Sequence, residues 1–292
     1  MVYIVNQNKT KKIKTMLVTV LTVVIIATVF SGCVENNTEG LVIVVVGRDS
    51  ASGTREFFYE HVMNSEDFVD TMLEKNSNGA VHQTVSQTEG AIGFVGLGYV
   101  DSAVKALKVN GVTPTVESVK DGSYPISRNL NMFTKGQPTG VALEFLNYID
   151  SNEGQAIVAD EGFVPKTETG AYTKVQGLSG TITIVGSTTV LPIGEKAAEA
   201  FNALYSGVTV TVSGGGSSVG IQSVGEGSAD IGMASREMKS SEETTYPDLV
   251  KHIVCADGIA LIVHPTNLFV NDLTITQIKA IYQGEYTNWN QL

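Results

Sequence analysis

One local plan occurs three times in this chain: an apolar, β-rich run, then a turn of glycine and hydroxyl residues, then the start of a helical pattern. The three copies of run and turn span residues 41–54, 181–189 and 208–218. The helical patterns begin at about Arg55, at Pro192, and at Val219 or Gly220. Apolar strands that alternate with helices predict an α/β fold with mainly parallel strands.

Each of these turns suits an anion, because the N–H groups at a helix N-terminus are unpaired and carry about half a positive charge. Hydroxyl side chains add further donors. A single turn of this kind is a weak signal, since serine and threonine are also common N-caps and glycine is common in turns. Three such turns favour the hypothesis that they converge on one small, highly charged oxyanion.

The first 33 residues differ from the rest of the chain. Four lysines precede an uncharged apolar run at residues 16–30, and Ser31 and Gly32 lead to Cys33. A 15-residue apolar run is short for a membrane span and typical of a signal peptide. We therefore expect a lipoprotein signal over residues 1–33 with lipidation at Cys33, or else an uncleaved membrane anchor. Either way, the remainder of the protein is predicted to lie outside the cytoplasm.

The net charge argues against nucleic acid as a partner. Residues 1–32 hold four lysines and no acidic residue, so their removal changes the formal net charge from −11 to −15. A body this acidic repels nucleic acid and anionic membranes at long range. The chain contains two cysteines, and if Cys33 is lipidated no intrachain disulfide forms. Cys255, in an apolar run, is predicted to be a buried thiol.

Motifs for nucleotides and metals are missing. No Gly-Lys-Ser/Thr follows a glycine loop, and Val219 stands where the dinucleotide fingerprint after Gly214 and Gly216 needs glycine. The four histidines have no metal-ligand spacing: His61, His82, His252 and His264. We expect no cofactor and no metal.

A hydrolase is one alternative. Residues 216–220 match the Gly-x-Ser-x-Gly elbow with Ser218 as nucleophile, and Asp257 and His264 follow in the matching order. Five-residue matches arise easily in such turns, and neither partner residue lies in a recognisable motif. We therefore interpret the chain as a binding protein rather than an enzyme.

Two arginines stand close to the predicted turns. Arg48 opens a turn of serine, glycine and threonine, where its guanidinium offers a bidentate, permanently charged group to an oxyanion. A surface ion pair with Asp49 or Glu56 is the alternative. Arg236 follows the predicted strand 229–233 and offers a second guanidinium.

Several segments together resemble the phosphate-binding proteins of ABC transporters. GSTTV at 186–190 and GGGSS at 214–218 resemble the first two phosphate loops of that family, and RDSASGT at 48–54 resembles the third. Further similar segments are ADIGMASR at 229–236, DGIA at 257–260, TNW at 287–289, TVSQT at 84–88 and GFVGLGY at 93–99. The resemblance covers nearly all of residues 41–292. It implies a two-domain periplasmic-binding-protein fold of type II with the ligand in the cleft between the domains.

The order of the segments departs from that family. Its members normally begin at the segment that resembles residues 180–292 here and continue into the segment that resembles residues 41–166. This resemblance implies a circular permutation, which folds tolerate when the old termini are close together. The domains are then 41–127 with 266–292, and 128–265, with a linker at 172–179. We predict that Gly40 and Leu292 lie close together.

The resemblance also implies the site residues. Phosphate is expected to bind residues from all three loops and two further candidates: Thr188, Thr189, Val190, Ser217, Arg48, Ser52, Gly53, Thr54, Asp257 and Arg236. Some family members use an aspartate as acceptor for the phosphate proton, and Arg236 occupies that position here. Asp257 is our substitute candidate, with an N-cap or hinge role as its alternative and Asp49 as the fallback.

The resemblance finally implies partners and location. A monomeric, lipid-anchored protein on the outer face of the cell membrane, extracellular or periplasmic, is expected to deliver inorganic phosphate to a membrane permease powered by an ATPase. Binding of another oxyanion, such as sulfate or molybdate, is the alternative within the same class.

Overall fold

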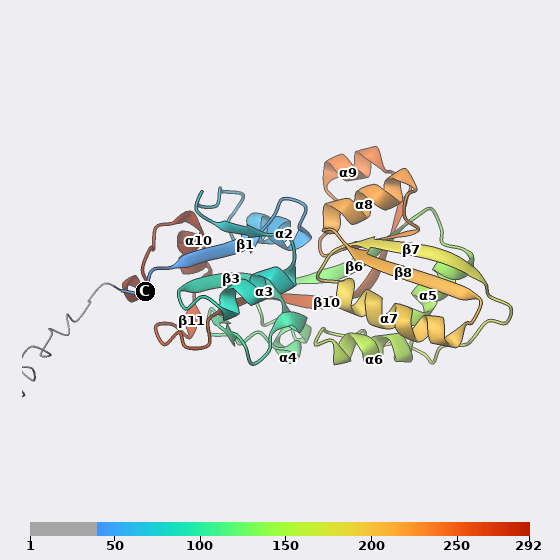
Figure 1. Ribbon diagram of the computed structural model, residues 1–292, viewed down its shortest axis with the longest axis horizontal. Coiled ribbons are helices and arrows are strands. Elements are labelled where there is room, and N and C mark those ends of the chain that lie inside the picture. Colours follow the sequence, from blue (N-terminus) through green and yellow to red (C-terminus); the bar gives the residue numbers. More distant parts are fainter. Residues whose placement is uncertain (1–39) are drawn as a thin grey trace, which may run out of the picture. The chain divides into compact units, whose positions relative to one another are not determined.

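The structure is a computed structural model that describes residues 40–292 (Figure 1). The predicted signal segment and Cys33 lie outside the described residues. Within residues 40–292, no helix has both the length and the apolar character needed to cross a membrane.

Two main apolar cores organise residues 41–292. We call lobe 1 the elements around the core that contains Phe58 and Trp289, and lobe 2 the elements around the core that contains Phe145 and Phe201. Lobe 1 contains β1 (Val44–Arg48), α2 (Gly53–His61), β2 (Leu73–Lys75), α3 (Asn78–Ser86), β3 (Ala91–Gly96), η1 (Leu97–Tyr99), β4 (Lys105–Ala106), β5 (Lys108–Val109), α4 (Val116–Lys120), β11 (Asp272–Leu273), α10 (Ile275–Gln283) and η2 (Trp289–Gln291). Lobe 2 contains β6 (Ser127–Lys135), α5 (Gly140–Ile149), α6 (Asn152–Asp160), β7 (Gly180–Gly186), α7 (Leu191–Leu204), β8 (Val208–Gly214), α8 (Ser217–Glu226), β9 (Ile231–Ala234) and α9 (Ser240–Thr245).

The long strand β10 (Leu249–Val263) belongs to both lobes. Its residues 259–263 pair antiparallel with β3, and its residues 249–258 pair antiparallel with β6. The sheet therefore continues through both lobes in the order β2-β1-β3-β10-β6-β9-β7-β8. Figure 1 shows β6 and β10 running between the two groups of elements.

Each lobe contains parallel strand pairs, and every pair that includes β6 or β10 is antiparallel. β1 pairs parallel with β2 and β3, and β7 pairs parallel with β8 and β9. β10 and β6 run against their neighbours. Parallel strands were predicted from the repeated strand–turn–helix plan, and the antiparallel strands lie outside that plan.

The three repeated segments fold as strand, turn and helix: β1 leads to α2, β7 to α7 and β8 to α8. Pro192 lies in the first turn of α7, where its missing N–H costs nothing. α8 begins at Ser217, slightly earlier than predicted. Gly216 before it has φ +99°, and a Cβ there would lie 2.5 Å from the Ala51 carbonyl oxygen, so the turn requires glycine.

The two ends of the described body lie side by side. The Ile43 N–H donates to the Thr287 carbonyl oxygen at 2.8 Å, and the Trp289 N–H donates to the Leu41 carbonyl oxygen at 2.9 Å. The segments that begin after Gly40 and end at Leu292 are thus in contact, which agrees with the prediction that Gly40 and Leu292 lie close together.

The division into domains stays a prediction. Ile259, Leu261 and Val263 pack in the core of lobe 1 although they precede residue 266, because the chain crosses between the cores within β10. The predicted linker 172–179 runs along lobe 2, where the Tyr172 hydroxyl lies 2.7 Å from the Tyr205 hydroxyl.

Trp289 anchors the end of the chain to lobe 1. Its side chain is 1% exposed, and its Nε1 donates to the Gly90 carbonyl oxygen at 3.0 Å. We predict that Trp289→Ala lowers the free energy of unfolding by about 3–5 kcal/mol, because it leaves a cavity and an unpaired carbonyl. Urea denaturation measures this loss. The control Leu268→Ala, at a side chain that is 87% exposed, should change stability by less than about 0.5 kcal/mol. A Trp289→Ala loss as small as that of the control would contradict this anchoring role.

Candidate functional site

Hydroxyl side chains from both lobes meet where the helices after the repeated turns begin. Thr54 in the first turn of α2 and Thr189 just before α7 have Oγ1 atoms 3.0 Å apart. Ser217, the first residue of α8, accepts the Ser235 N–H at 3.0 Å. We call these four residues the hydroxyl cluster, and each is at most 1% exposed. The helix N-termini bring N–H groups and positive partial charge to the same place.

Gly53 allows α2 to approach α8 within this cluster. A Cβ at Gly53 would lie 2.2 Å from Ser217 Oγ and 2.9 Å from Ser235 Oγ. Real Cβ atoms do not approach other atoms so closely, so the contact between the lobes depends on the absence of a side chain here.

A buried ion pair lies against the cluster. Arg128 on β6 and Asp257 on β10 face each other in the strand register, and their side chains are 2% and 0% exposed. Arg128 donates from Nε and Nη2 to Asp257 Oδ2 at 3.1 and 2.9 Å. Its Nη2 also lies 3.0 Å from Thr54 Oγ1, while Nη1 is buried without a partner among the described residues.

The charge state of Asp257 is set by opposing effects. Burial raises the pKa of its carboxyl group above the ordinary value, whereas Arg128 and the Leu97 N–H favour the carboxylate. The Leu97 N–H donates to Oδ1 at 2.9 Å. The pair presents no net charge, and Arg128 remains a donor toward the cluster.

Asn78, the first residue of α3, contacts the hydroxyl cluster from lobe 1. It is 0% exposed, and its Nδ2 donates to Thr188 Oγ1 at 3.1 Å and to Thr189 Oγ1 at 3.0 Å. Its Oδ1 accepts the Gly96 N–H at 3.2 Å. Tyr99 adds a further contact between the lobes, because its hydroxyl donates to the Thr188 carbonyl oxygen at 2.6 Å.

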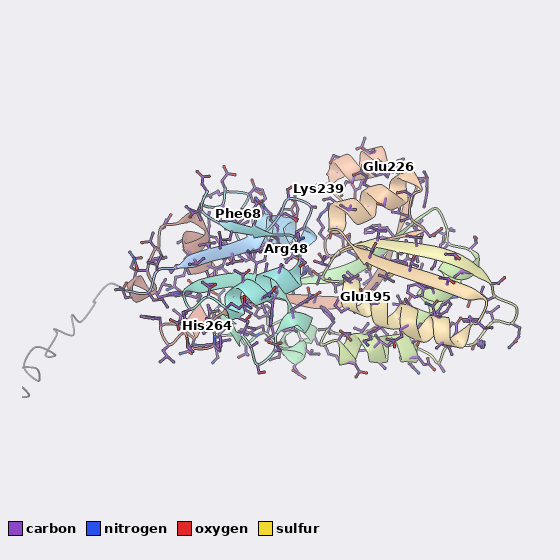
Figure 2. All side chains as sticks on the ribbon, viewed as in Figure 1. Arg48, Phe68, Glu195, Glu226, Lys239 and His264 are labelled. Carbon is purple, nitrogen blue, oxygen red and sulfur yellow. The ribbon has the colours of Figure 1, made fainter. Side chains whose placement is uncertain are left out.

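Arg48 lies at the end of β1 and is 1% exposed (Figure 2). Its Nε donates to the Lys75 carbonyl oxygen and its Nη2 to the Asn76 carbonyl oxygen, both at 3.1 Å. Burial lowers the pKa of Arg48 to about 10, so the guanidinium stays charged at neutral pH. Two of its three nitrogens are thus held by backbone groups, and it does not offer the free fork that its sequence position suggested.

The structure brings together five of the predicted residues: Gly53, Thr54, Thr189, Ser217 and Asp257. Thr188 is held by residues of lobe 1, whereas Val190 and Ser52 have partners in or beside their own turns. Thr188 faces Asn78 and Tyr99, the Val190 N–H donates to the Ser187 carbonyl oxygen at 3.1 Å, and Ser52 caps α2 by accepting the Arg55 N–H at 3.2 Å.

Arg236 is held away from the cluster by its own ion pair. Its Nη1 and Nη2 donate to the carboxylate of Glu242 at 2.6 and 2.7 Å, and its Nη2 also donates to Ser218 Oγ at 3.0 Å. Arg236 therefore organises the segment that leads to α9.

Sequence reasoning missed Arg128, Asn78, Ser235 and Tyr99. Arg128 and Asn78 lie outside the repeated turns, and nothing in their flanking residues indicates that they are buried. Signals for Ser235 and Tyr99 were present, because they lie in the segments ADIGMASR and GFVGLGY that were already singled out.

The three residues of the hydrolase alternative have separate partners. Ser218 accepts from Arg236, Asp257 accepts from Arg128, and His264 Nδ1 lies 2.8 Å from Thr266 Oγ1. His264 is in lobe 1, after the end of β10 (Figure 2). The order of these residues in the sequence does not assemble a triad in this structure.

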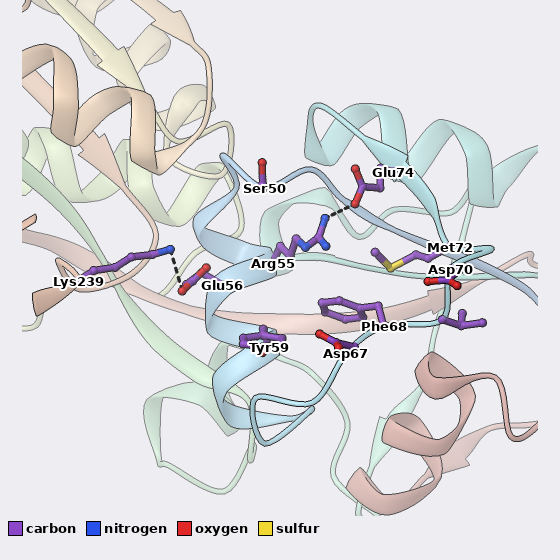
Figure 3. A pocket seen from close by; sticks show the side chains of 11 residues that line it. Ser50, Arg55, Glu56, Tyr59, Asp67, Phe68, Asp70, Met72, Glu74 and Lys239 are labelled. Atoms are coloured by element: carbon purple, nitrogen blue, oxygen red, sulfur yellow. Dashed lines mark hydrogen bonds and ion pairs between the residues drawn. The ribbon is translucent and has the colours of Figure 1, made fainter. Parts of the chain in front are cut away.

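A hollow of about 570 Å³ beside α2 has the wrong charge for an anion. Its lining contains four acidic side chains and two basic ones: Glu56, Asp67, Asp70, Glu74, Arg55 and Lys239. Figure 3 shows both basic groups already paired, Arg55 with Glu74 and Lys239 with Glu56. An oxyanion is therefore better placed at the hydroxyl cluster, where donors predominate.

Comparisons with known proteins identify the family of this chain. Residues 1–153 and 171–292 match a family model described as a PBP superfamily domain. Phosphate-binding protein PstS 2 of Streptococcus agalactiae is 37% identical over 276 residues, which cover 90% of this chain and 93% of the relative. Phosphate-binding protein PstS of Bacillus subtilis is 38% identical over 128 residues, which cover 43% of this chain and 42% of the relative.

A solved structure has the same fold over most of its length. It is the phosphate-binding protein of a phosphate ABC transporter from Streptococcus pneumoniae, with a TM-score of 0.69, 34% identity, and coverage of 86% of this chain and 99% of that one. This chain therefore belongs to the PstS-like family of phosphate-binding proteins, with the two-domain α/β fold of the PBP superfamily.

Proposed function

We propose that this protein binds inorganic phosphate outside the cytoplasm and delivers it to the permease of an ABC transporter. The hydroxyl cluster carries the proposal: residues far apart in the sequence place Thr54, Thr189 and Ser217 beside helix N-termini and a buried guanidinium. The names of the relatives support the same ligand.

The cluster suits a dehydrated dianion. Phosphate that leaves water needs many fixed donors in exchange, and micromolar binding already requires about −8 kcal/mol net. Thr54, Thr189, Ser217 and the Gly53 N–H are the proposed donors, and Arg128, paired with Asp257, is the nearest guanidinium. Arg48, anchored by two carbonyls, adds positive potential.

The two halves of this chain are proposed to occur in the opposite order to the two halves of the B. subtilis protein. The alignment with the S. agalactiae relative runs through 90% of this chain, which supports a shared order. The alignment with the B. subtilis relative covers 43% of this chain. An alignment in chain order includes only one half when the halves are exchanged.

The proposed location is the outer face of the cell membrane, extracellular or periplasmic, with a lipid on Cys33 as the anchor. Cys33 precedes lobe 1 in the sequence, so the anchor would be attached through that lobe. The proposed partners are a permease and its ATPase, and the protein is proposed to act as a monomer.

Isothermal titration calorimetry with phosphate, sulfate and molybdate tests the ligand. Phosphate should bind with a Kd of about 10 µM or lower, and the other two anions at least about 100-fold more weakly. An assay of ester turnover run beside it should give no activity that depends on Ser218. Absence of phosphate binding, or tighter binding of sulfate or molybdate, would reject the proposed ligand.

Gly53→Ala should weaken phosphate binding by about 10- to 100-fold, because the new methyl group cannot fit 2.2 Å from Ser217 Oγ. Calorimetry measures the change. Gly79→Ala is the matched control, since a Cβ at Gly79 meets nothing within 4 Å. Equal affinities of the two variants would argue against the approach of α2 to α8 as part of the site.

Asp257 is the proposed acceptor for the phosphate proton. A carboxylate has about four acceptor sites, and three are taken by the Leu97 N–H and two donors of Arg128. We predict that Asp257→Asn reduces the preference for phosphate over sulfate by about 10-fold or more. Competition titrations of both anions measure the preference. Asp230→Asn, at an exposed carboxylate in lobe 2, is the control, and an unchanged preference in Asp257→Asn would remove the assignment.

A further inference from the structure

Two buried donors fix the direction of the hydrogen bonds in the hydroxyl cluster. Asn78 Oδ1 accepts the Gly96 N–H, so the amide nitrogen of Asn78 must face the cluster, where it donates to Thr189 Oγ1 at 3.0 Å. Arg128 has no acceptor atom. Its Nη2 carries two hydrogens: one donates to Asp257 Oδ2 at 2.9 Å, and the other donates to Thr54 Oγ1 at 3.0 Å and also approaches Thr189 Oγ1 at 3.5 Å.

The shared hydrogen of Arg128 favours one direction for the hydroxyl hydrogens of Thr189 and Thr54. A threonine hydroxyl has two acceptor lone pairs and one hydrogen. Thr189 Oγ1 accepts from Asn78 and is approached by the hydrogen of Arg128 that Thr54 shares, so we infer that its own hydrogen is directed to Thr54 Oγ1, 3.0 Å away. Thr54 Oγ1 then accepts from Arg128 and Thr189. The hydrogen of Thr54 is left to donate to a group beyond this pair.

We propose that Asn78 is a positioning residue for phosphate binding, which starts a relay from Asn78 through Thr189 to Thr54 and makes the Thr54 hydroxyl a donor to a phosphate oxygen. This inference rests on the proposed function. Asn78 does not itself have to contact phosphate. Its effect is to occupy the acceptor capacity of Thr189, because hydrogen bonds in a chain polarise one another in a buried site.

The relay also depends on contact between the lobes. Asn78 and Thr54 belong to lobe 1, and Thr189 belongs to lobe 2, so the chain of hydrogen bonds crosses the boundary twice. Separation of the lobes removes both acceptors of Asn78, which are Thr188 and Thr189, and takes Asn78 and Thr54 away from Thr189. The donor at Thr54 is therefore oriented only in the arrangement in which the lobes touch.

The experiment replaces Asn78 with aspartate, which has nearly the same shape. The carboxylate accepts where the amide donated, so the Thr189 hydrogen turns toward Asp and the relay reverses. We expect phosphate binding by Asn78→Asp to be weaker by about 100-fold or more, measured by calorimetry at neutral pH. Aspartate is favourable in the first turn of a helix, so α3 should still form, and thermal denaturation checks this.

The pH profile separates positioning from a structural defect. Burial should raise the pKa of the introduced carboxyl group, so lowering the pH protonates it and restores a neutral group that can donate. The ratio of the variant's Kd to the wild-type Kd at the same pH should therefore fall between about pH 8 and about pH 5. The protonation of phosphate itself cancels in this ratio. A ratio that stays constant with pH would overturn the inference.

Asn267→Asp is the matched control. Asn267 is 1% exposed and accepts the Phe269 N–H at 3.0 Å, so the same change of charge occurs at an equally buried amide that makes no contact with the cluster in the described residues. Its phosphate Kd should stay within about twofold of wild type, while Asn78→Ala, which removes the donor without adding charge, should bind about 5- to 10-fold more weakly.

The outcomes are distinguishable. Failure of the wild-type protein to bind phosphate overturns the proposed function and the relay together. Normal binding by the wild type, with Asn78→Asp within about twofold of it, overturns the relay and leaves the proposed function in place.

Discussion

The antiparallel pairing of β10 with β3 on one side and with β6 on the other holds both lobes on one sheet. The Arg128–Asp257 ion pair lies in this pairing, at opposed positions of β6 and β10, so the strands that connect the lobes also fix a charge beside the hydroxyl cluster. Burial of both charges is costly and is offset only by their mutual contacts and by donors such as the Leu97 N–H. Loss of either partner would leave an uncompensated charge at the point where the chain crosses between the lobes.

Local dipoles rather than net charge make an anion site compatible with such an acidic protein. The formal charge of the whole chain is −11, and acidic side chains outnumber basic ones in the lining of the hollow beside α2. At the cluster the balance reverses, because Asp257 is neutralised by Arg128 and the helix N-termini add partial positive charge. The fully buried hydroxyls keep these short-range effects unscreened by water. The acidic surface then affects the approach of phosphate more than its final binding energy.

The sequence predicted those parts of the site that are local. Thr54, Thr189 and Ser217 lie in turns whose glycine and hydroxyl pattern sets both the turn and the helix start, so adjacent residues were enough to find them. Arg128 and Asn78 could not be found in this way, because their roles depend on which strand lies opposite and which loop packs against α3. The same reason explains the wrong expectation for Arg236. Its position in the sequence favours a role in phosphate binding, but Glu242, six residues later, holds it in an ion pair.

The position of the site within each lobe means that the proposed exchange of the two halves would leave it intact. The cluster is built at the carboxyl ends of β1 and β7, whereas Leu41 and Leu292 lie near the amino end of β1 and the linker 172–179 precedes the amino end of β7. A strand of five residues, as in β1, separates its two ends by roughly 16 Å at about 3.3 Å per residue. Opening the connection between Leu292 and Leu41 and forming the linker 172–179 would therefore alter only loops at the amino ends of β1 and β7. The turns that carry Thr54 and Thr189 keep their own strands and helices, and with them the geometry that makes them donors.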